Sequence, residues 1–188
     1  MKKGYKQIEI EHRSRFSKKV YNSLLNFLEK EGKDLGQDDK NVYFFTFPDK
    51  LLKVTDNISK QTAKITGKLT RIGHGSNFEE IEIPINQSDV GKAVRLLKKF
   101  GFADVHNTYQ KRHNYLYKGI EIAVKYSKVW GYHAEFEIMI SDLKEKTNAD
   151  KKIQSLAKQL EIRLMTEDEL KRFIDRKEKE INKSKSKN

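Results

Sequence analysis

Hydrophobic and polar residues alternate strictly along residues 7–16, QIEIEHRSRF, near the start of the chain. One set of alternate positions contains Ile8 and Ile10. The other set is charged and comprises Glu9, Glu11, Arg13 and Arg15. Successive side chains of a β-strand point to opposite faces, so this period of two predicts a strand with one apolar and one charged face.

The pattern along the rest of the chain predicts eight strands and four helices. Strands are expected at residues 6–16, 42–47, 50–57, 62–72, 78–85, 104–117, 120–128 and 134–140. Helices are expected at residues 17–32, 88–100, 148–162 and from 166 onward. Gly32 and Gly101 stand where glycine commonly ends a helix, and Thr166 and Glu169 have capping-box spacing. A polar loop is expected at residues 33–41. This order indicates an α+β fold whose strands are mostly antiparallel.

Two further predicted strands repeat the row of acids. Glu80 and Glu82 alternate with isoleucines, and Glu135 and Glu137 alternate with apolar residues. A single strand with one charged face is typical of a sheet whose charged face is exposed to water. Three strands of this kind favour another arrangement. If the helices cover the apolar faces, the charged faces turn inward around a polar lumen. We therefore predict a barrel, or tunnel, of about eight antiparallel strands with helices packed outside.

The bulk composition narrows the class of protein. The 188 residues suffice for a buried core, with 36% hydrophobic and 35% charged residues. The absence of cysteine excludes disulfides and thiolate chemistry, and no Gly-rich phosphate loop is present. No apolar run is long enough to span a membrane. We expect a cytoplasmic protein without membrane contact, with one domain at residues 1–175 and a basic, disordered tail at 176–188.

The chain carries a formal net charge of +12. Such a charge attracts polyanions, including nucleic acids. Lysines expected on the outside of helices include Lys18, Lys19, Lys98 and Lys99. Weak nucleic-acid binding through this basic exterior is one hypothesis, and it predicts an affinity that falls steeply with salt.

Carboxylates that face one another across a lumen repel, and burying them unpaired is costly. Either hard divalent cations such as Mg²⁺ or Mn²⁺, or bases from other strands, would neutralise them. Bases do occur at strand spacing: Arg13, Arg15, Lys53, Lys64, Lys68, Arg112 and Lys125. Their side chains match phosphate oxygens. Acids, a divalent metal and many cations together predict a ligand with several phosphates.

These motifs resemble those of a known family. Residues 9–13, EIEHR, resemble the ExExK signature that opens CYTH domains. Residues 78–102, from FEEIEIPI to the helix ending LLKKFGF, resemble the middle acid strand and helix of that family. Residues 131–137, GYHAEFE, resemble its closing G-x-x-x-E-x-E strand, and Arg112 with Tyr115 resembles the base and aromatic of another strand.

The resemblance covers roughly residues 5–165 and implies an eight-stranded antiparallel tunnel that binds ATP or another triphosphate with Mg²⁺ or Mn²⁺. Activities in the family include cyclisation of ATP and hydrolysis of thiamine triphosphate, inorganic triphosphate or RNA 5′-triphosphate. The implied metal ligands are Glu9, Glu11, Glu135 and Glu137, with Glu80 and Glu82 as further ligands or orienting groups. The seven bases named above would bind the triphosphate, and no catalytic group is assigned.

The chain also departs from the family pattern. Arg13 replaces the lysine of ExExK, Phe78 stands where an arginine often precedes the middle acids, and Gln110 replaces a lysine. Lys125 and Lys128 stand where many relatives have acids. The lysine that precedes a glycine in the family corresponds here to Thr66, Lys64 or Lys68. An acid-to-lysine change inside the tunnel would favour anion binding and weaken metal-assisted chemistry.

Two functions of the lumen are therefore open. In an enzyme, attack by water would give a triphosphatase, and attack by the ribose 3′-oxygen would give a class IV adenylyl cyclase. The alternative, motivated by Gln110 and Lys125, is a catalytically weak module that binds nucleotide, polyphosphate or RNA without turnover.

Trp130 is expected to pack in the core or at the rim, with stacking on a nucleobase as the alternative. Either a monomer or a homodimer is compatible with the sequence.

Overall fold

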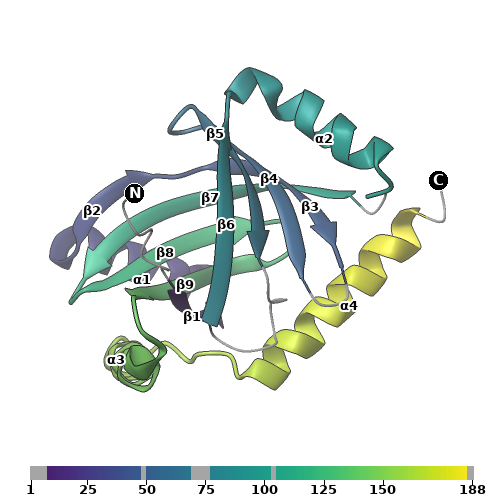
Figure 1. Ribbon diagram of the computed structural model, residues 1–188. Coiled ribbons are helices and arrows are strands. Elements are labelled where there is room, and N and C mark those ends of the chain that lie inside the picture. Colours follow the sequence, from purple (N-terminus) through teal and green to yellow (C-terminus); the bar gives the residue numbers. More distant parts are fainter. Residues whose placement is uncertain (1–7, 48–49, 69–76, 103–104, 186–188) are drawn as a thin grey trace.

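The structure is a computed structural model that describes residues 8–47, 50–68, 77–102 and 105–185 (Figure 1). The strands are β1 Ile8–Arg15, β2 Lys33–Gln37, β3 Lys40–Thr46, β4 Leu51–Asn57, β5 Thr62–Lys68, β6 Asn77–Ile85, β7 Val105–Tyr117, β8 Ile120–Ser127 and β9 Gly131–Ile140. The helices are α1 Lys18–Glu31, α2 Val90–Lys99, α3 Lys146–Gln159 and α4 Glu167–Lys185. Short 3₁₀ turns, Gln87–Asp89 and Leu143–Glu145, precede α2 and α3.

Eight strands form a closed antiparallel ring. Their order is β7-β3-β4-β5-β6-β1-β9-β8, and β8 pairs again with β7. The closure depends on the length of β7, because its first half pairs with β3 while its second half pairs with β8. The predicted barrel of about eight antiparallel strands, with helices packed outside, is confirmed.

One expected loop is a strand. Residues 33–41 contain β2 and the start of β3, and β2 pairs with the second half of β7. The side chains of β2 are mostly exposed, so no alternation of apolar and polar residues marks this segment. Its extended conformation comes from backbone hydrogen bonds to a distant strand, which a pattern of side chains does not reveal.

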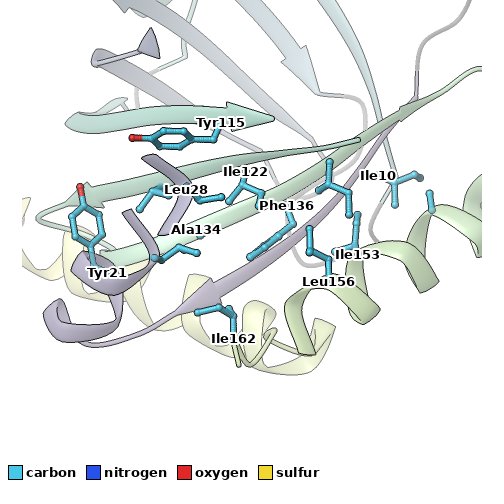
Figure 2. Packing of buried hydrophobic residues seen from close by; sticks show 14 of the residues in the cluster. Ile10, Tyr21, Leu28, Tyr115, Ile122, Ala134, Phe136, Ile153, Leu156 and Ile162 are labelled. Atoms are coloured by element: carbon cyan, nitrogen blue, oxygen red, sulfur yellow. The ribbon is translucent and has the colours of Figure 1, made fainter. Parts of the chain in front are cut away.

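The main core lies outside the barrel wall, between the sheet and helices α1 and α3 (Figure 2). Leu28 of α1, Ile153 of α3 and Phe136 of β9 are fully buried there. A smaller cluster lies under α2, where Val94 packs with Phe45 and Val54. The apolar face of each strand therefore points to the helices, which leaves the charged face for the lumen.

Helix α4 extends further than the sequence indicated. Thr166 and Glu169 form the expected capping box, because each side chain accepts a hydrogen bond from the other residue's backbone N–H. The helix continues to Lys185, whereas a disordered tail was expected from residue 176. Lys177 pairs with Glu180 one turn away, and such pairs support an exposed helix. Among the described residues, no helix is both long and apolar enough to cross a membrane.

Candidate functional site

The barrel encloses a cavity of about 730 Å³. Eight acids line it: Glu9, Glu11, Asp38, Glu80, Glu82, Glu121, Glu135 and Glu137. Eight bases line it as well: Arg13, Lys40, Lys53, Lys60, Lys64, Lys68, Arg112 and Lys125. The formal charges of these lining residues sum to zero, so the net charge of +12 belongs to the rest of the chain.

The strand pairing brings acids and bases together. Arg13 of β1 lies opposite Glu135 of β9, and Lys68 of β5 lies opposite Glu80 of β6. Because side chains at directly paired positions share one face of a sheet, each pair points into the lumen. All three acid rows predicted from the sequence therefore line one cavity.

The first group of charges, which we call the Lys68 cluster, contains Lys68, Glu9, Glu11 and Glu80. The Lys68 ammonium lies 2.5 Å from Glu80, 3.2 Å from Glu9 and 3.7 Å from Glu11. Burial, together with the charge of Glu11, raises the pKa of Glu9 to about 10. Lys53 also lines the lumen here, and burial followed by repulsion from Lys68 lowers its pKa to about 8.

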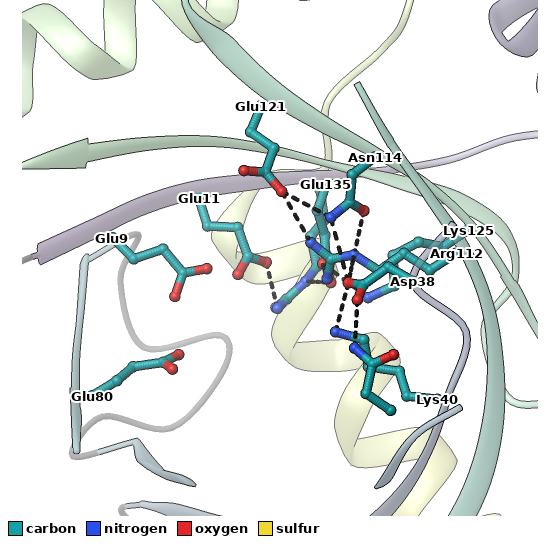
Figure 3. Close-up of polar contacts among 12 residues, drawn as sticks. Glu9, Glu11, Asp38, Lys40, Glu80, Arg112, Asn114, Glu121, Lys125 and Glu135 are labelled. Atoms are coloured by element: carbon teal, nitrogen blue, oxygen red, sulfur yellow. Dashed lines mark hydrogen bonds and ion pairs between the residues drawn. The ribbon is translucent and has the colours of Figure 1, made fainter. Parts of the chain in front are cut away.

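The second group, the Glu135 cluster, contains Glu135 and three bases (Figure 3). The carboxylate of Glu135 lies 2.8 Å from Lys125, 3.1 Å from Arg13 and 3.3 Å from Arg112. Burial alone would raise the pKa of Glu135, but these three cations hold it well below its usual range. Both carboxylate oxygens are therefore already engaged, which distinguishes Glu135 from the other predicted metal ligands.

Several acids of the lumen lie close to Glu11, and its charge helps to raise the pKa values of Glu9 and Glu137. Arg13 links the two clusters by pairing with both Glu11 and Glu135. Burial and the neighbouring charge of Glu11 raise the pKa of Glu137 to about 7. Nearby acids make it harder for a carboxyl group to lose its proton. A place where this happens favours the binding of additional positive charge.

These carboxylates fit a hard divalent cation in their chemistry. Mg²⁺ and Mn²⁺ prefer oxygen ligands, and Glu9, Glu11, Glu80 and Glu137 supply them. Among the described residues, no three acids or histidines are arranged to hold an ion as they stand. Lys68 lies between the acids, so its ammonium would have to shift for an ion to be bound.

A third group of lumen residues was missed by the sequence analysis. Asp38 accepts hydrogen bonds from Asn57 at 2.6 Å and Asn114 at 3.4 Å, and it pairs with Lys40 at 2.7 Å and Arg112 at 3.2 Å (Figure 3). Asp38 falls in the segment that was predicted to be a loop. The only sequence signal for Lys40 is that it shares a period of two with later residues of β3. Because those residues are apolar, the pattern does not mark Lys40 as a base of the lumen.

The two predicted bases at the ends of the lumen lie in different surroundings. Lys64 pairs with Glu82 at 2.5 Å, and both side chains are about two-fifths exposed. Arg15 does not line the cavity. Its guanidinium donates a hydrogen bond to the backbone carbonyl of Trp130 and lies 4.2 Å from the ring centre of Phe173 on α4. The expectation that Arg15 binds phosphate is therefore not supported by its position.

Trp130 lines the cavity, but its ring already has partners. Phe173 lies 4.7 Å away and His133 lies 5.3 Å away, measured between ring centres. The position agrees with packing at the rim, the first of the two interpretations of Trp130. Burial and the nearby Lys125 lower the pKa of His133 to about 3, so this imidazole is neutral.

The positions that depart from the family pattern also lie in different surroundings. Gln110 and Lys125 both line the lumen, whereas Lys128 is exposed. Of the three candidates for the family's lysine, Lys68 lies among the glutamates, and Thr66 is fully buried. The side chain of Phe78 lies outside the described residues.

Residues 7–174 match the CYTH domain family. Among solved structures, the PH1012 protein of Pyrococcus horikoshii is 23% identical with a TM-score of 0.69, and the match covers 84% of this chain and 94% of that chain. A conserved hypothetical protein from Pyrococcus furiosus is 23% identical with a TM-score of 0.68, again covering 84% and 94%. HpAC1 from Hippeastrum, described as having a dominant triphosphatase activity, is 15% identical with a TM-score of 0.58, covering 84% and 89%. No curated protein matches the chain significantly. At these identities, the likeness shows a shared fold.

Proposed function

We propose, from the premise that this chain belongs to the CYTH domain family, that its lumen binds and converts a nucleotide or another organic triphosphate with the help of Mg²⁺ or Mn²⁺. The observation that carries this proposal is the cavity inside the barrel, which eight acids and eight bases line. A triphosphate and divalent metal ions have opposite charges, so together they fit a lumen whose own formal charge is zero.

The two clusters suit different parts of such a complex. Glu9, Glu11, Glu80 and Glu137 would hold the metal, which when bound neutralises phosphate charge and polarises the phosphoryl group. Arg112 of β7 and Lys125 of β8 would bind phosphate oxygens. In this arrangement Glu135 orients the bases by pairing with them. This assignment changes the predicted role of Glu135 from metal ligand to positioning residue.

Product analysis would test the proposal. The protein would be incubated separately with ATP, GTP, thiamine triphosphate and inorganic triphosphate, each with Mg²⁺ or Mn²⁺. Cyclic nucleotide with pyrophosphate would identify a cyclase, and release of orthophosphate would identify a triphosphatase. Either activity should be lost in Glu9→Gln/Glu11→Gln, which preserves shape and removes charge. Glu29→Gln, on the exposed face of α1, is the matched control and should retain full activity.

A catalytically weak binding module remains the second candidate, and the surroundings of Glu135 favour it. Three bases already neutralise this carboxylate, so the lumen offers fewer free acids for metal than its composition suggests. A module of this kind would show no turnover, but a triphosphate would raise its melting temperature. If there is neither turnover nor stabilisation by any of the four triphosphates, the lumen is not a triphosphate site.

A further inference from the structure

The outer face of β6 is a part of the barrel wall that the helices leave uncovered. In Figure 1, β6 lies between α2 and α3 with no helix across it. The outward side chains of Ile81 and Ile83 are each 55% exposed, whereas the outward Ile8 and Ile10 of the neighbouring strand β1 are buried. Adjacent exposed isoleucines on a sheet are unfavourable in water, and such patches commonly mark interaction sites.

This apolar surface continues into a groove beside α2. Ile81, Ile83 and Ile85 follow one another at period two on β6, so their side chains form one row. The groove begins at Ile85 and runs along α2 past Leu96, which is 58% exposed, with a volume of about 610 Å³. We call Ile81, Ile83, Ile85 and Leu96 the β6 strip.

The surface beside the row is also open. Gly67 of β5 lies opposite Ile81 in the sheet. Apart from Gly67 itself and its two chain neighbours, no described atom lies within 4 Å of where a Cβ on Gly67 would be. A partner side chain could therefore occupy this open space and contact the flank of Ile81.

Basic residues border the groove. Lys92, Arg95 and Lys99 all line it, and the acid among the lining residues, Asp89, already pairs with Lys92 at 2.8 Å. Within the described part of the chain, Arg95 and Lys99 form no ion pair, and both are exposed. The strip thus presents an apolar centre with a positive rim, which calls for a ligand with an apolar face and acidic edges.

We propose that the β6 strip is a docking site for an acidic amphipathic helix of a partner protein. A helix of this type places apolar residues along one face and acids beside them, which matches the row of isoleucines and the bases that α2 places along one edge of the groove. A second copy of this chain is a poor occupant, because two molecules with a net charge of +12 repel. A bilayer surface is flat, whereas the groove is concave. The proposal concerns the outside of the barrel and is independent of the function of the lumen.

Fluorescence anisotropy would test the site with a defined probe. The probe is a fluorescein-labelled synthetic helix with leucines on one face and glutamates on both flanks, compared with a scrambled peptide of the same composition. The full chain should bind the helix at least tenfold more tightly than the scrambled peptide. Ile81→Ser/Ile83→Ser should remove this preference, and Arg95→Glu/Lys99→Glu should weaken binding at least tenfold. Leu143→Ser is the matched control, because Leu143 is equally exposed at 55% on another part of the surface.

Each variant would first be checked for an unchanged melting temperature and for unchanged stabilisation by inorganic triphosphate, which separates this site from the lumen. Equal binding of the ordered and scrambled peptides would overturn the proposal. So would full binding by a folded Ile81→Ser/Ile83→Ser variant. Anionic vesicles and single-stranded RNA would be titrated in parallel. If either binds through the isoleucines while the helix does not, the partner is of another class and the proposal is wrong.

Discussion

Lys68 is the residue whose surroundings say most about the lumen. Its ammonium is shared by Glu9, Glu11 and Glu80, which come from two different strands. A buried base in this position does what a bound cation would do, because it balances acids that would otherwise repel. The side chain and a metal ion therefore compete for the same negative charge.

Replacement of Lys68 by methionine tests this competition. The variant should lose about 3–5 kcal/mol in its free energy of unfolding at neutral pH, because it removes a buried cation that three acids share. Mn²⁺ should then stabilise Lys68→Met more than it stabilises the unsubstituted protein. Urea unfolding with and without Mn²⁺ measures both effects. Equal stabilisation of the two proteins by Mn²⁺ would show that the ion does not bind among these acids.

Lys125 should contribute directly to anion binding. Its ammonium is buried in the lumen wall 2.8 Å from Glu135. Loss of one charge-assisted contact should weaken the affinity of Lys125→Met for inorganic triphosphate about tenfold, which corresponds to about 1.4 kcal/mol. Isothermal titration calorimetry at pH 7 measures this affinity. Lys128→Met removes an exposed lysine from the turn that follows β8 and should bind as the original chain does; a similar loss in both variants would contradict a specific role for Lys125.

At the scale of elements, α4 packs against the barrel through Phe173. Phe173 is 4% exposed and is the only fully buried residue of α4 among those whose side chains the structure describes. It packs against Trp130, which lines the lumen, and against the guanidinium of Arg15. Because Phe173 lies outside the main core, α4 can separate from the barrel without disrupting that core.

Phe173→Ala should release α4 and leave the barrel folded. Backbone amides of α4 should exchange faster with solvent, while the free energy of barrel unfolding should change by less than about 1 kcal/mol, because the main core is untouched. Trp130 is the only tryptophan in the chain, so a red shift of its fluorescence should report its greater exposure to water. Leu170→Ala, on the same helix, is the control. An unchanged Trp130 spectrum in Phe173→Ala would show that other contacts hold α4 in place.

At the scale of the whole molecule, buried lysines should make stability depend on pH. Burial, followed by repulsion from Arg112, lowers the pKa of Lys40 from 10.5 to about 8. Between these two values the unfolded chain holds a proton that the folded chain has lost. The free energy of unfolding should therefore rise as pH increases from about 8 towards 10.5.

Lys40→Met should reduce this rise. A shift of this size corresponds to about 3 kcal/mol at 1.36 kcal/mol for each pKa unit, and the side chain of Lys40 is 16% exposed. Urea unfolding at pH 8 and pH 10 measures the change in both proteins. Because Lys53 and Lys125 also have lowered pKa values, the variant should keep part of the rise. Identical pH dependence in the two proteins would mean that Lys40 keeps its proton in the folded state.

The distribution of charge over the molecule leads to a separate prediction about nucleic acids. Since the lumen acids and bases cancel, the excess positive charge lies elsewhere on the chain. Weak RNA binding, where it occurs, should fall steeply with salt and should not be displaced by inorganic triphosphate. Filter binding at several salt concentrations, with and without triphosphate, checks this. Displacement by triphosphate at constant ionic strength would instead place the RNA in the lumen.

The amino-acid sequence was enough to predict which faces of β1, β6 and β9 turn towards the lumen. Alternation in β1, β6 and β9 has a period of two, and that period follows from the geometry of an extended backbone, without reference to any neighbour. Charge on one face and apolar residues on the other, in three strands, therefore indicated an inward-facing charged surface and helices outside. The capping box of α4 was visible for the same reason, since its two residues are only three positions apart.

Which charges meet inside the lumen depends on the tertiary fold. Arg13 and Glu135 are 122 positions apart, and their contact depends on the pairing of β1 with β9, which no local pattern specifies. The same is true of β2, whose polar side chains carry no strand signal because its partner is the distant half of β7. Arg15 shares the period of Glu9 and Glu11 but lies at the end of its strand, where α4 takes it out of the lumen. Local periodicity fixes the face of the sheet from which a side chain projects. The residue that this side chain contacts depends on strand register and on how the ring of strands closes.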